Sequence, residues 1–355
     1  MLFLQIMKRI LLIFICLFSL NIFCQTIVGT VFDENRMPIE GVSVYLNGTT
    51  MATLTDEKGK YFLEVNKKIN TELVIRFMGY ETVNIANPYD NNNSKIYLVP
   101  NQIVLKEVII KKDYFTRKQK LELFRAIFLG TTKAGKLCKI ENEEDVSFEY
   151  NYKTNTLFAT SDAPIKILNP YLGYKIKFDL HQFQVKLSKK STKIEDVIKS
   201  LFLGTTLYTD VNDTPAIKKN RIKVYTGSPM QFFKYLAENR WEKDLFLSIE
   251  RGFLVTPEKY FTISTEGSLK KVNVESKIKD QSLSVDSKPI FYASFNFIFN
   301  QKKQSKVNFL TNVFYVDEYG NNSENDKIEF AGDFATKKLG DMLPMNYSPE
   351  LSDKL

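Results

Sequence analysis

The sequence predicts a mainly β protein in two parts: a seven-stranded β-sandwich over residues 25–110, then a β-rich α+β domain with a few short helices over residues 111–355. Three observations favour this fold class. The 355 residues leave room for about two domains, and 44% of them are hydrophobic. Aromatic residues, which favour the half-buried faces of sheets, make up 13%. Short apolar segments alternate with turn residues along most of the chain.

The first part reads as short strands with turns between them. Residues 47–48 (Asn-Gly) and 56–59 (Asp to Gly) are the clearest turns, because Asp bonds nearby amides and Gly accepts a positive φ. Residues 42–46 alternate between apolar and polar side chains, as a half-buried strand does. We therefore expect a small antiparallel sandwich with strands at residues 27–32, 42–46, 51–55, 61–65, 73–77, 82–85 and 95–98.

Residues 1–24 differ from the rest of the chain. Lys8 and Arg9 precede an apolar run over residues 10–23, which is the pattern of a secretory signal peptide. That run is shorter than the roughly 20 apolar residues of a membrane-spanning helix. The sequence therefore predicts cleavage after Cys24 and an exported protein of the periplasm or outer membrane. Two alternatives stay open: acylation of Cys24, disfavoured by the bulky residue before it, and a retained anchor.

The chain is moderately basic, with a net charge of +8. Loss of residues 1–24 leaves 47 Lys and Arg against 41 Asp and Glu, a net charge of +6. The basic residues are spread along the chain without the interleaved aromatics of a nucleic-acid site, so we expect no nucleic-acid partner. Weak peripheral attraction to an anionic membrane or polysaccharide stays open.

The composition leaves few residues from which a common catalytic or metal site could be built. His181 is the only His, so the usual His pair of a zinc peptidase cannot form, and no Gly-x-Ser-x-Gly motif marks a serine hydrolase. Cys138 is the only Cys after residue 24, which excludes an intramolecular disulfide and favours a small buried hydrophobe. A Cys138–His181 dyad is the remaining nucleophilic arrangement. The sequence predicts no catalytic residue, no cofactor and no metal site.

Two acidic patterns are weaker signals. Carboxylate pairs occur at residues 141–145, 195–196 and 317–318, and a hydrolase can use such a pair. Residues 316–326 are rich in oxygen ligands around a Gly and resemble a calcium loop without EF-hand spacing. A hairpin turn explains that loop equally well.

Exposed aromatic side chains are the better ligand signal. Trp241 beside Arg240, and Tyr171 and Tyr174 around Gly173, are the candidates for stacking on a sugar or peptide. Core packing is the alternative for all three rings, since most large aromatics are interior.

Residues in the first part resemble the carboxypeptidase regulatory-like domain, a transthyretin-like (Ig-like) sandwich. The matching residues are Gly29, Asp33, Pro38, Ile39, Gly41, Val42, Val44, Gly48, Thr49, Thr55, Asp56, Gly59, Tyr61, Gly79 and Tyr80. The same module opens TonB-dependent receptors, where it ends in a segment similar to residues 105–110. The resemblance implies a sandwich scaffold in the envelope. It implies no catalytic residue, because in carboxypeptidases this domain is an appendage.

The second part mixes helical and strand-like segments. We expect helices over residues 118–129, 194–203 and 228–240, the last from a Ser-Pro-Met-Gln capping box. Expected strands are residues 145–152 and 156–161 as a hairpin, 165–168, 173–187 with a register slip near residue 181, and a meander over 252–334 that includes 291–299 and 307–315. Residues 225–228, 232–236 and 251–253 make this part similar to uncharacterised exported proteins that carry the same regulatory-like domain. That resemblance assigns no residue roles.

The pentapeptide Phe-Leu-Gly-Thr-Thr occurs at residues 128–132 and again at 202–206. Each copy follows a helix-like segment, so we expect two helix ends capped by Gly. A true internal repeat would need similarity outside these residues.

These observations favour a non-catalytic exported envelope protein that binds a protein, peptide or glycan, with strand addition at a sheet edge as one mode. The alternative is a hydrolase of peptide or glycan that uses a carboxylate site in the second part. A buried acid pair in a cleft would favour the hydrolase.

Overall fold

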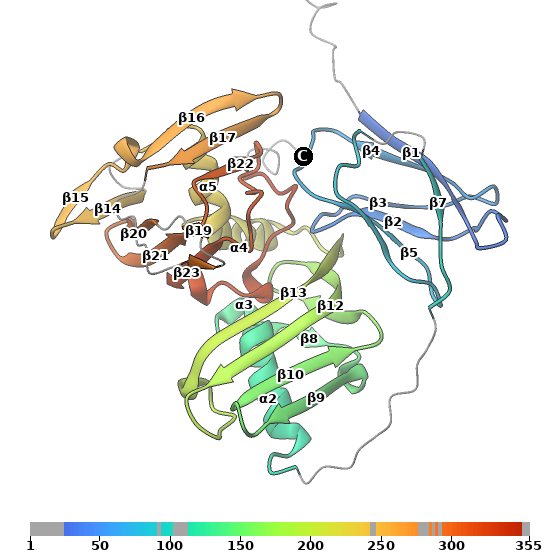
Figure 1. Ribbon diagram of the computed structural model, residues 1–355, viewed down its shortest axis with the longest axis horizontal. Coiled ribbons are helices and arrows are strands. Elements are labelled where there is room, and N and C mark those ends of the chain that lie inside the picture. Colours follow the sequence, from blue (N-terminus) through green and yellow to red (C-terminus); the bar gives the residue numbers. More distant parts are fainter. Residues whose placement is uncertain are drawn as a thin grey trace, which may run out of the picture.

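The computed structural model describes residues 25–90, 94–101, 113–241, 246–275, 284–285, 288–289 and 293–349. The predicted signal peptide and the receptor-like segment at 105–110 lie outside the described residues. The predicted fold class is confirmed: the chain is mainly β, with several sheets and a few short helices. Figure 1 shows the N-terminal sandwich, a large sheet below it, and a C-terminal β unit beside both.

The N-terminal sandwich contains the seven predicted strands. They are β1 (Gln25–Phe32), β2 (Ser43–Leu46), β3 (Ala52–Leu54), β4 (Lys60–Val65), β5 (Leu73–Arg76), β6 (Val83–Ile85) and β7 (Ser94–Tyr97). One sheet has the order β4-β1-β7 and the other β3-β2-β5-β6. The all-antiparallel prediction was wrong at one pair: the chain crosses from β6 to the other sheet, so β7 runs parallel to β1.

The sandwich core follows from the period of two along its strands. In β4 the inward residues Tyr61, Leu63 and Val65 are buried, and the residues between them are exposed. They pack with apolar side chains from the opposite sheet, including Val44 and Ile75. Burial of one face from each sheet is the arrangement that stabilises a sandwich.

The middle unit packs one helix on a six-stranded sheet of order β8-β11-β12-β10-β9, with β13 paired to β12. Its elements are α2 (Arg117–Phe128), α3 (Lys133–Leu137), β8 (Lys139–Ile140), η1 (Glu143–Asp145), β9 (Val146–Asn151), β10 (Thr156–Ser161), β11 (Ile165–Asn169), β12 (Tyr174–Leu187), η2 (Ile194–Asp196) and β13 (Val197–Asp210). The predicted hairpin is β9–β10. The predicted slip is a bulge between Leu180 and Gln182.

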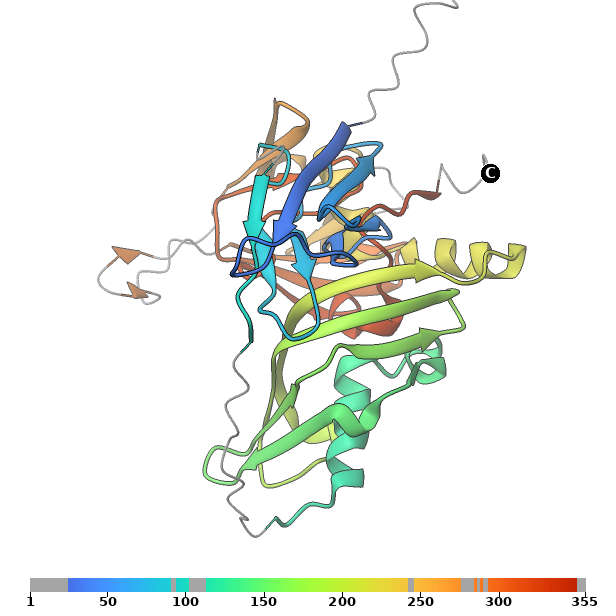
Figure 2. The ribbon, with the colours of Figure 1, turned by 90° about the vertical axis from the view of Figure 1, so that its right-hand side faces the viewer.

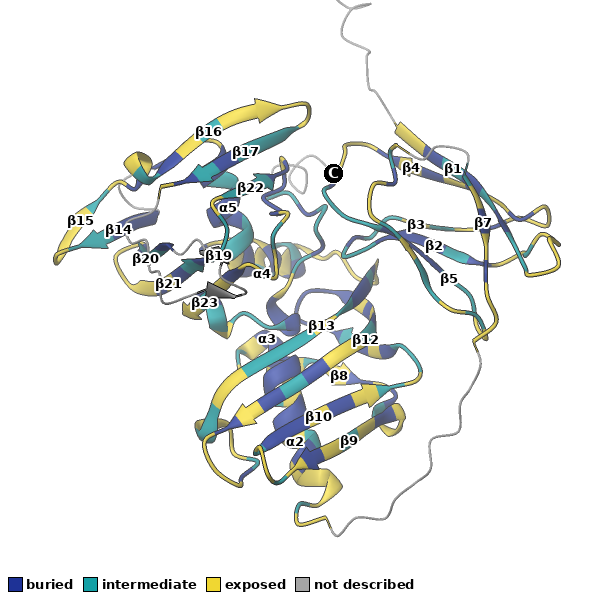
Figure 3. Ribbon diagram, viewed as in Figure 1, coloured by how far each residue is buried: buried dark blue, intermediate teal, exposed yellow. Residues whose placement is uncertain are grey.

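Helix α2 begins at a capping box, in which Thr116 and Gln119 satisfy each other's backbone amides. Its buried face includes Leu123, Phe124 and Phe128, which contact the sheet. Figure 2 shows α2 along one face of the sheet, and Figure 3 shows the buried residues along it. The predicted helix over 118–129 is thereby confirmed.

The predicted helix over residues 194–203 was wrong. The segment starts with the short turn η2 and continues as the 14-residue strand β13. β13 pairs with β12 along nearly its whole length, and this long-range pairing overrides the local helical pattern. The second Phe-Leu-Gly-Thr-Thr copy therefore lies in a strand, whereas the first ends a helix at Gly130, so the two copies are not a structural repeat.

The C-terminal unit contains two helices and several antiparallel strands. Its elements are α4 (Pro215–Tyr225), α5 (Pro229–Ala237), β14 (Phe246–Glu250), β15 (Phe253–Val255), η3 (Glu258–Tyr260), β16 (Phe261–Glu266), β17 (Leu269–Val274), β18 (Ser284–Val285), β19 (Lys288–Pro289), β20 (Ala293–Phe299), β21 (Lys303–Phe309), β22 (Val313–Val316), β23 (Ile328–Gly332), η4 (Phe334–Thr336) and η5 (Leu339–Asp341). The main sheet has the order β15-β14-β20-β21-β23 and a second sheet β16-β17-β22.

Helix α5 holds this unit together. Ser228 caps the helix as predicted, but the predicted capping box does not form, because Oε1 of Gln231 accepts from the Gly227 N–H, and the helix ends at Ala237 before residue 240. Phe232 and Phe233 are buried in a core of aromatic side chains from both sheets. The predicted strand over 307–315 was wrong, because β21 ends at Phe309 and β22 joins β17 in the other sheet. Helix α4 was missed, although its Thr214-Pro215 start is a regular cap. No described helix is long and apolar enough to cross a bilayer.

Candidate functional site

The β2–β3 turn of the sandwich joins the end of strand β13, and this contact defines the seam between the two parts of the chain. The Gly48 N–H donates to the Thr206 carbonyl (2.7 Å), and the Tyr208 N–H donates to the Thr49 carbonyl (3.0 Å). The Thr206 N–H donates to Oδ1 of Asn47 (2.8 Å). Thr49 is fully buried. The turn therefore extends the β13 edge as a short parallel bridge.

The C-terminal tail closes the same seam from the other side. The Met345 N–H donates to the Gly48 carbonyl (2.7 Å). Asn346 bonds Thr50 twice: its Nδ2 donates to Oγ1 (2.8 Å), and its Oδ1 accepts from the Thr50 N–H (3.2 Å). The backbone of the β2–β3 turn is thus shared between β13 and the tail.

A half-buried ion pair also crosses the seam. Arg76 of β5 lies 2.5 Å from Oδ1 of Asp179 on β12. Burial raises the pKa of Asp179, and the Arg76 guanidinium opposes that shift. Next to this pair the hydroxyls of Tyr45 and Thr205 are 3.3 Å apart, and burial raises the pKa of Tyr45 to about 12. Polar contacts from β2 and β5 of the sandwich thus reach β12 and β13.

Arg221 of α4 organises the charged cluster beside the seam. Its Nη2 donates to Oδ1 of Asp210 (2.7 Å) and its Nη1 to Oδ1 of Asp213 (3.3 Å). Its Nε donates to the Leu172 carbonyl (2.8 Å), and its guanidinium lies 4.0 Å from the centre of the Tyr174 ring. The Arg221 side chain is only 8% exposed, whereas both carboxylates are 51% exposed.

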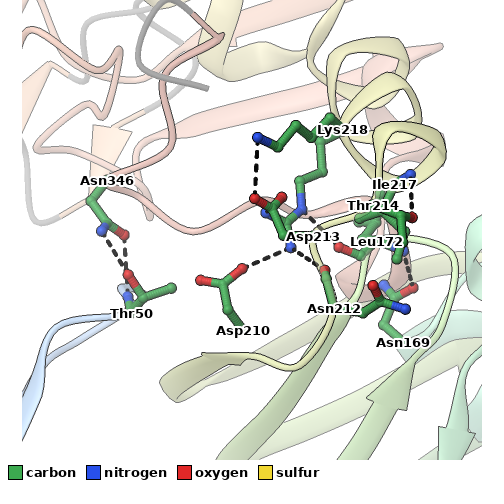
Figure 4. Close-up of polar contacts among 11 residues, drawn as sticks. Thr50, Asn169, Leu172, Asp210, Asn212, Asp213, Thr214, Ile217, Lys218 and Asn346 are labelled. Atoms are coloured by element: carbon green, nitrogen blue, oxygen red, sulfur yellow. Dashed lines mark hydrogen bonds and ion pairs between the residues drawn. The ribbon is translucent and has the colours of Figure 1, made fainter. Parts of the chain in front are cut away.

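Figure 4 shows this cluster with Asp210 and Asp213 between α4 and the Thr50–Asn346 contact. Lys218 lies 3.3 Å from Oδ2 of Asp213 and adds a second cation. Two acids and two bases thus offset each other, and each carboxylate keeps one side in water. Of the described carboxylate groupings, this one comes nearest to an acid pair that could meet a substrate.

Asp317 lies in the predicted calcium-like loop, and both oxygens of its carboxylate accept hydrogen bonds from the protein. Oδ1 accepts from the Tyr319 and Asn321 N–H groups (2.9 and 3.0 Å), and Oδ2 accepts from the Asn70 N–H (3.0 Å). Burial raises the pKa of Asp317, and the hydrogen bond from the Asn321 side chain opposes the shift. The alternative prediction of a hairpin was wrong for the whole loop, because β22 and β23 belong to different sheets; only a short turn closed by the Val316–Asn322 bridge forms. The loop ties β22 to the sandwich through the Asn70 N–H.

The structure separates Cys138 from His181. Lys139 pairs with Leu168, which pairs with Lys175, and His181 lies six residues further along β12. Six strand residues span about 20 Å, so the two side chains cannot form a dyad. The thiol of Cys138 donates to a helix carbonyl 3.4 Å away, and burial raises its pKa to about 12. His181 is exposed at the bulge.

The other predicted carboxylate pairs are separate surface groups. Asp145 accepts from the side chain of Asn142 (2.7 Å) and lies in a 3-10 turn. Asp196 pairs with Lys189 (3.2 Å), and a hydrogen bond from Ser191, together with Lys189, lowers its pKa. Among the described residues, no group of three or more His, Cys, Asp or Glu is placed to hold a metal ion.

The three aromatic candidates for ligand stacking belong to the core, which was the alternative prediction for them. Trp241 is 8% exposed and donates from Nε1 to the side chain of Asn239 (3.0 Å). Tyr171 and Tyr174 are also buried. The rings that do face solvent are others, among them Phe62 and Tyr97 of the sandwich. The alternation of exposed and buried residues in β4 is the signal that could have found Phe62.

Comparison with known proteins finds one family model and several solved structures, two of which are described here. The first structure is a type II cohesin–X-dockerin complex from Acetivibrio cellulolyticus (20% identity, 31% of this chain and 79% of that chain, TM-score 0.19). The second is a putative membrane-associated protein of unknown function from Bacteroides fragilis (11% identity, 84% of this chain and 98% of that chain, TM-score 0.16). No curated protein matches the chain. Residues 27–110 match the CarboxypepD_reg-like domain family, so the N-terminal sandwich is a carboxypeptidase regulatory-like domain.

Proposed function

We propose that this chain is a non-catalytic, exported binding protein that holds a protein, peptide or glycan at the periplasm or outer membrane. The observation that carries the proposal is the state of the clustered carboxylates. Asp317 is surrounded by N–H donors, Asp179 pairs with Arg76, and the Asp210–Asp213 cluster is bound by Arg221. Each of these groups stabilises contacts within the protein, and a scaffold needs no more chemistry than that.

The regulatory-like domain supports the same proposal, since it assigns no catalytic residue. The backbone hydrogen bonds at the seam join the sandwich to β13 and to the C-terminal tail, which suits a protein that presents a surface. Export and envelope location are part of the proposal and rest on residues 1–24. Peripheral contact with an anionic membrane is a further mode that the surplus of basic residues favours.

A hydrolase remains the second candidate because of one observation: Asp210 and Asp213 are half exposed beside a buried guanidinium. The test compares the chain lacking residues 1–24 with its Asp210→Asn/Asp213→Asn variant on casein and on purified peptidoglycan. We expect no release of amines or reducing ends by either protein. Turnover by the wild type that the double variant loses would overturn the binding proposal.

Binding and export have their own readouts. Immobilised protein should retain an envelope component that elutes with unchanged mass, and a component that elutes cleaved would favour the hydrolase. Intact-mass measurement of the protein from an expressing cell separates the three forms of the N-terminus. A chain that starts at Gln25 supports cleavage, lipid on Cys24 supports acylation, and a full-length chain supports the anchor.

A further inference from the structure

The outer face of the sheet β4-β1-β7 is an ordered surface that the seam leaves open. In β4, Phe62 points away from the core and is 62% exposed. In β7, Tyr97 also points outward and is 48% exposed. The seam uses the other sheet of the sandwich, because Tyr45 and Arg76 lie in β2 and β5. Figure 1 shows β1 and β4 on the side of the sandwich away from β12 and β13.

The strand register places these side chains in three rows. Phe62 lies opposite Val28 in the first row, and Tyr97 lies opposite Phe32 in the third. The Phe32 and Tyr97 rings stack with centres 5.4 Å apart and planes inclined by 24°. Phe62 and Tyr97 are therefore separated by four residues along the strands and by two strand spacings across the sheet. These combine to a distance of about 16 Å between the two positions.

The middle row is basic. Thr30 of β1 lies opposite Lys60 of β4 on one side and opposite Lys95 of β7 on the other. Both Lys residues are exposed. A ligand that extends from one aromatic group to the other must therefore pass between two ammonium groups.

We propose that this face, named here the β1 face and made of Phe32, Lys60, Phe62, Lys95 and Tyr97, binds an acidic glycan. The aromatic rings stack on the apolar faces of sugar rings, and the Lys pair binds carboxylate or phosphate groups between them. This inference rests on the proposed binding function and names the ligand class.

Two other occupants fit the face less well. A second copy of the chain would place the Lys pair against another Lys pair in a protein of net charge +8. A folded protein partner needs about 800 Å² of contact on each side. The three strands offer a width of about 10 Å and a length of about 13 Å, so a narrow polymer matches the face better. Extended peptides add to a sheet edge, and here the ligand groups lie on a sheet face.

The test uses the chain lacking residues 1–24 and three polymers in a calorimetric titration at low salt. Polygalacturonate carries carboxylates on sugar rings, phosphomannan carries phosphates on sugar rings, and poly-L-glutamate carries carboxylates without rings. We expect saturable binding to one or both acidic glycans that weakens with added salt. The two glycans distinguish carboxylate from phosphate. Equal binding of poly-L-glutamate, or no binding to either glycan, overturns the inference.

Variants then place the binding on the β1 face. Phe62→Ala and Tyr97→Ala should each weaken binding about tenfold, the effect of losing one stacked ring. The matched control is Phe253→Ala, which removes a ring that is 74% exposed in another sheet and should change nothing. Binding that survives both sandwich substitutions overturns the inference.

The Lys pair is tested by charge reversal. Lys60→Glu/Lys95→Glu should abolish most of the salt-dependent binding, whereas Lys302→Glu/Lys306→Glu, which makes the same change in net charge at exposed residues of the β20–β21 hairpin, should leave it intact. Equal losses in both proteins would reduce the effect to net charge and overturn the assigned site. Loss of glycan binding leaves the binding function standing where the protein still retains an envelope component, so the two proposals fail separately.

Discussion

Replacing Arg221 by Met tests whether the charged cluster holds α4 and β13 together. The substitution removes two ion pairs and two hydrogen bonds, which Arg221 donates to the carbonyls of Leu172 and Asn212. Asp210 and Asp213 are half exposed, so water can solvate them again, and each lost pair costs less than about 1 kcal/mol. Leu172 is fully buried, so loss of its donor costs about 1–3 kcal/mol.

The expected loss in the free energy of unfolding is therefore about 1–5 kcal/mol. Urea unfolding, followed by circular dichroism and by the fluorescence of the single Trp241, measures it. The matched control is Lys199→Met. The Lys199 side chain is 74% exposed and its Nζ lies 3.4 Å from Glu329, so its replacement should cost less than about 1 kcal/mol. A loss in Arg221→Met no larger than in Lys199→Met would refute the reasoning.

Three further predictions concern the backbone at Gly173, the thiol of Cys138 and the carboxylate of Asp317. Gly173→Ala and Gly41→Ala both place Ala at a similar positive φ, but only at Gly173 does the new Cβ meet a backbone oxygen, 2.2 Å away. We therefore expect Gly173→Ala to lose about 1–3 kcal/mol more stability than Gly41→Ala in urea unfolding. Equal losses in the two variants would contradict this. Since burial raises the pKa of Cys138 to about 12, a disulfide reagent at pH 8 should label it about 10³-fold more slowly than an exposed thiol; labelling at the rate of glutathione would disprove the burial argument. Burial also raises the pKa of the Asp317 carboxyl group in the folded protein above its unfolded pKa of about 3.9. The stability that this group contributes is therefore fully present below the unfolded pKa and is lost as the pH rises through the folded pKa. The unfolding free energy of Asp317→Asn relative to wild type should therefore increase between pH 3 and pH 7, and a constant difference would rule this out.

The sandwich could be predicted because its signals are local. Each turn has its own Gly, Asn or Asp, and each strand is short, so the seven strands follow without knowledge of their partners. The direction of β7 could not be predicted, because it depends on which sheet the chain enters after β6. The helix expected over residues 194–203 failed for a related reason: β13 exists because β12 offers it a partner along its length.

The charged cluster was beyond sequence reasoning. Leu172 and Arg221 are 49 residues apart, and they meet only because α4 returns to the start of β12. The helix itself was within reach, since Thr214 and Pro215 form a regular start. The β1 face is a mixed case. The alternation of Lys60 and Phe62 shows that both share one side of β4, but their relation to Lys95 requires the register of β1 with β7.

The position of the sandwich limits what this domain can do in the whole chain. Gly48 and Thr49 are among the residues that identify the regulatory-like domain, and here they form the contact with β13 and with the tail. A sandwich free on a linker could offer both of its sheets to partners. In this chain the contacts of the β2–β3 turn, Tyr45 and Arg76 commit the sheet β3-β2-β5-β6 to the seam. The sheet β4-β1-β7 takes no part in these contacts. Its outward side chains include Lys60, Phe62 and Tyr97 beside the carboxylate of Glu64, so position and chemistry both favour this face for the proposed ligand.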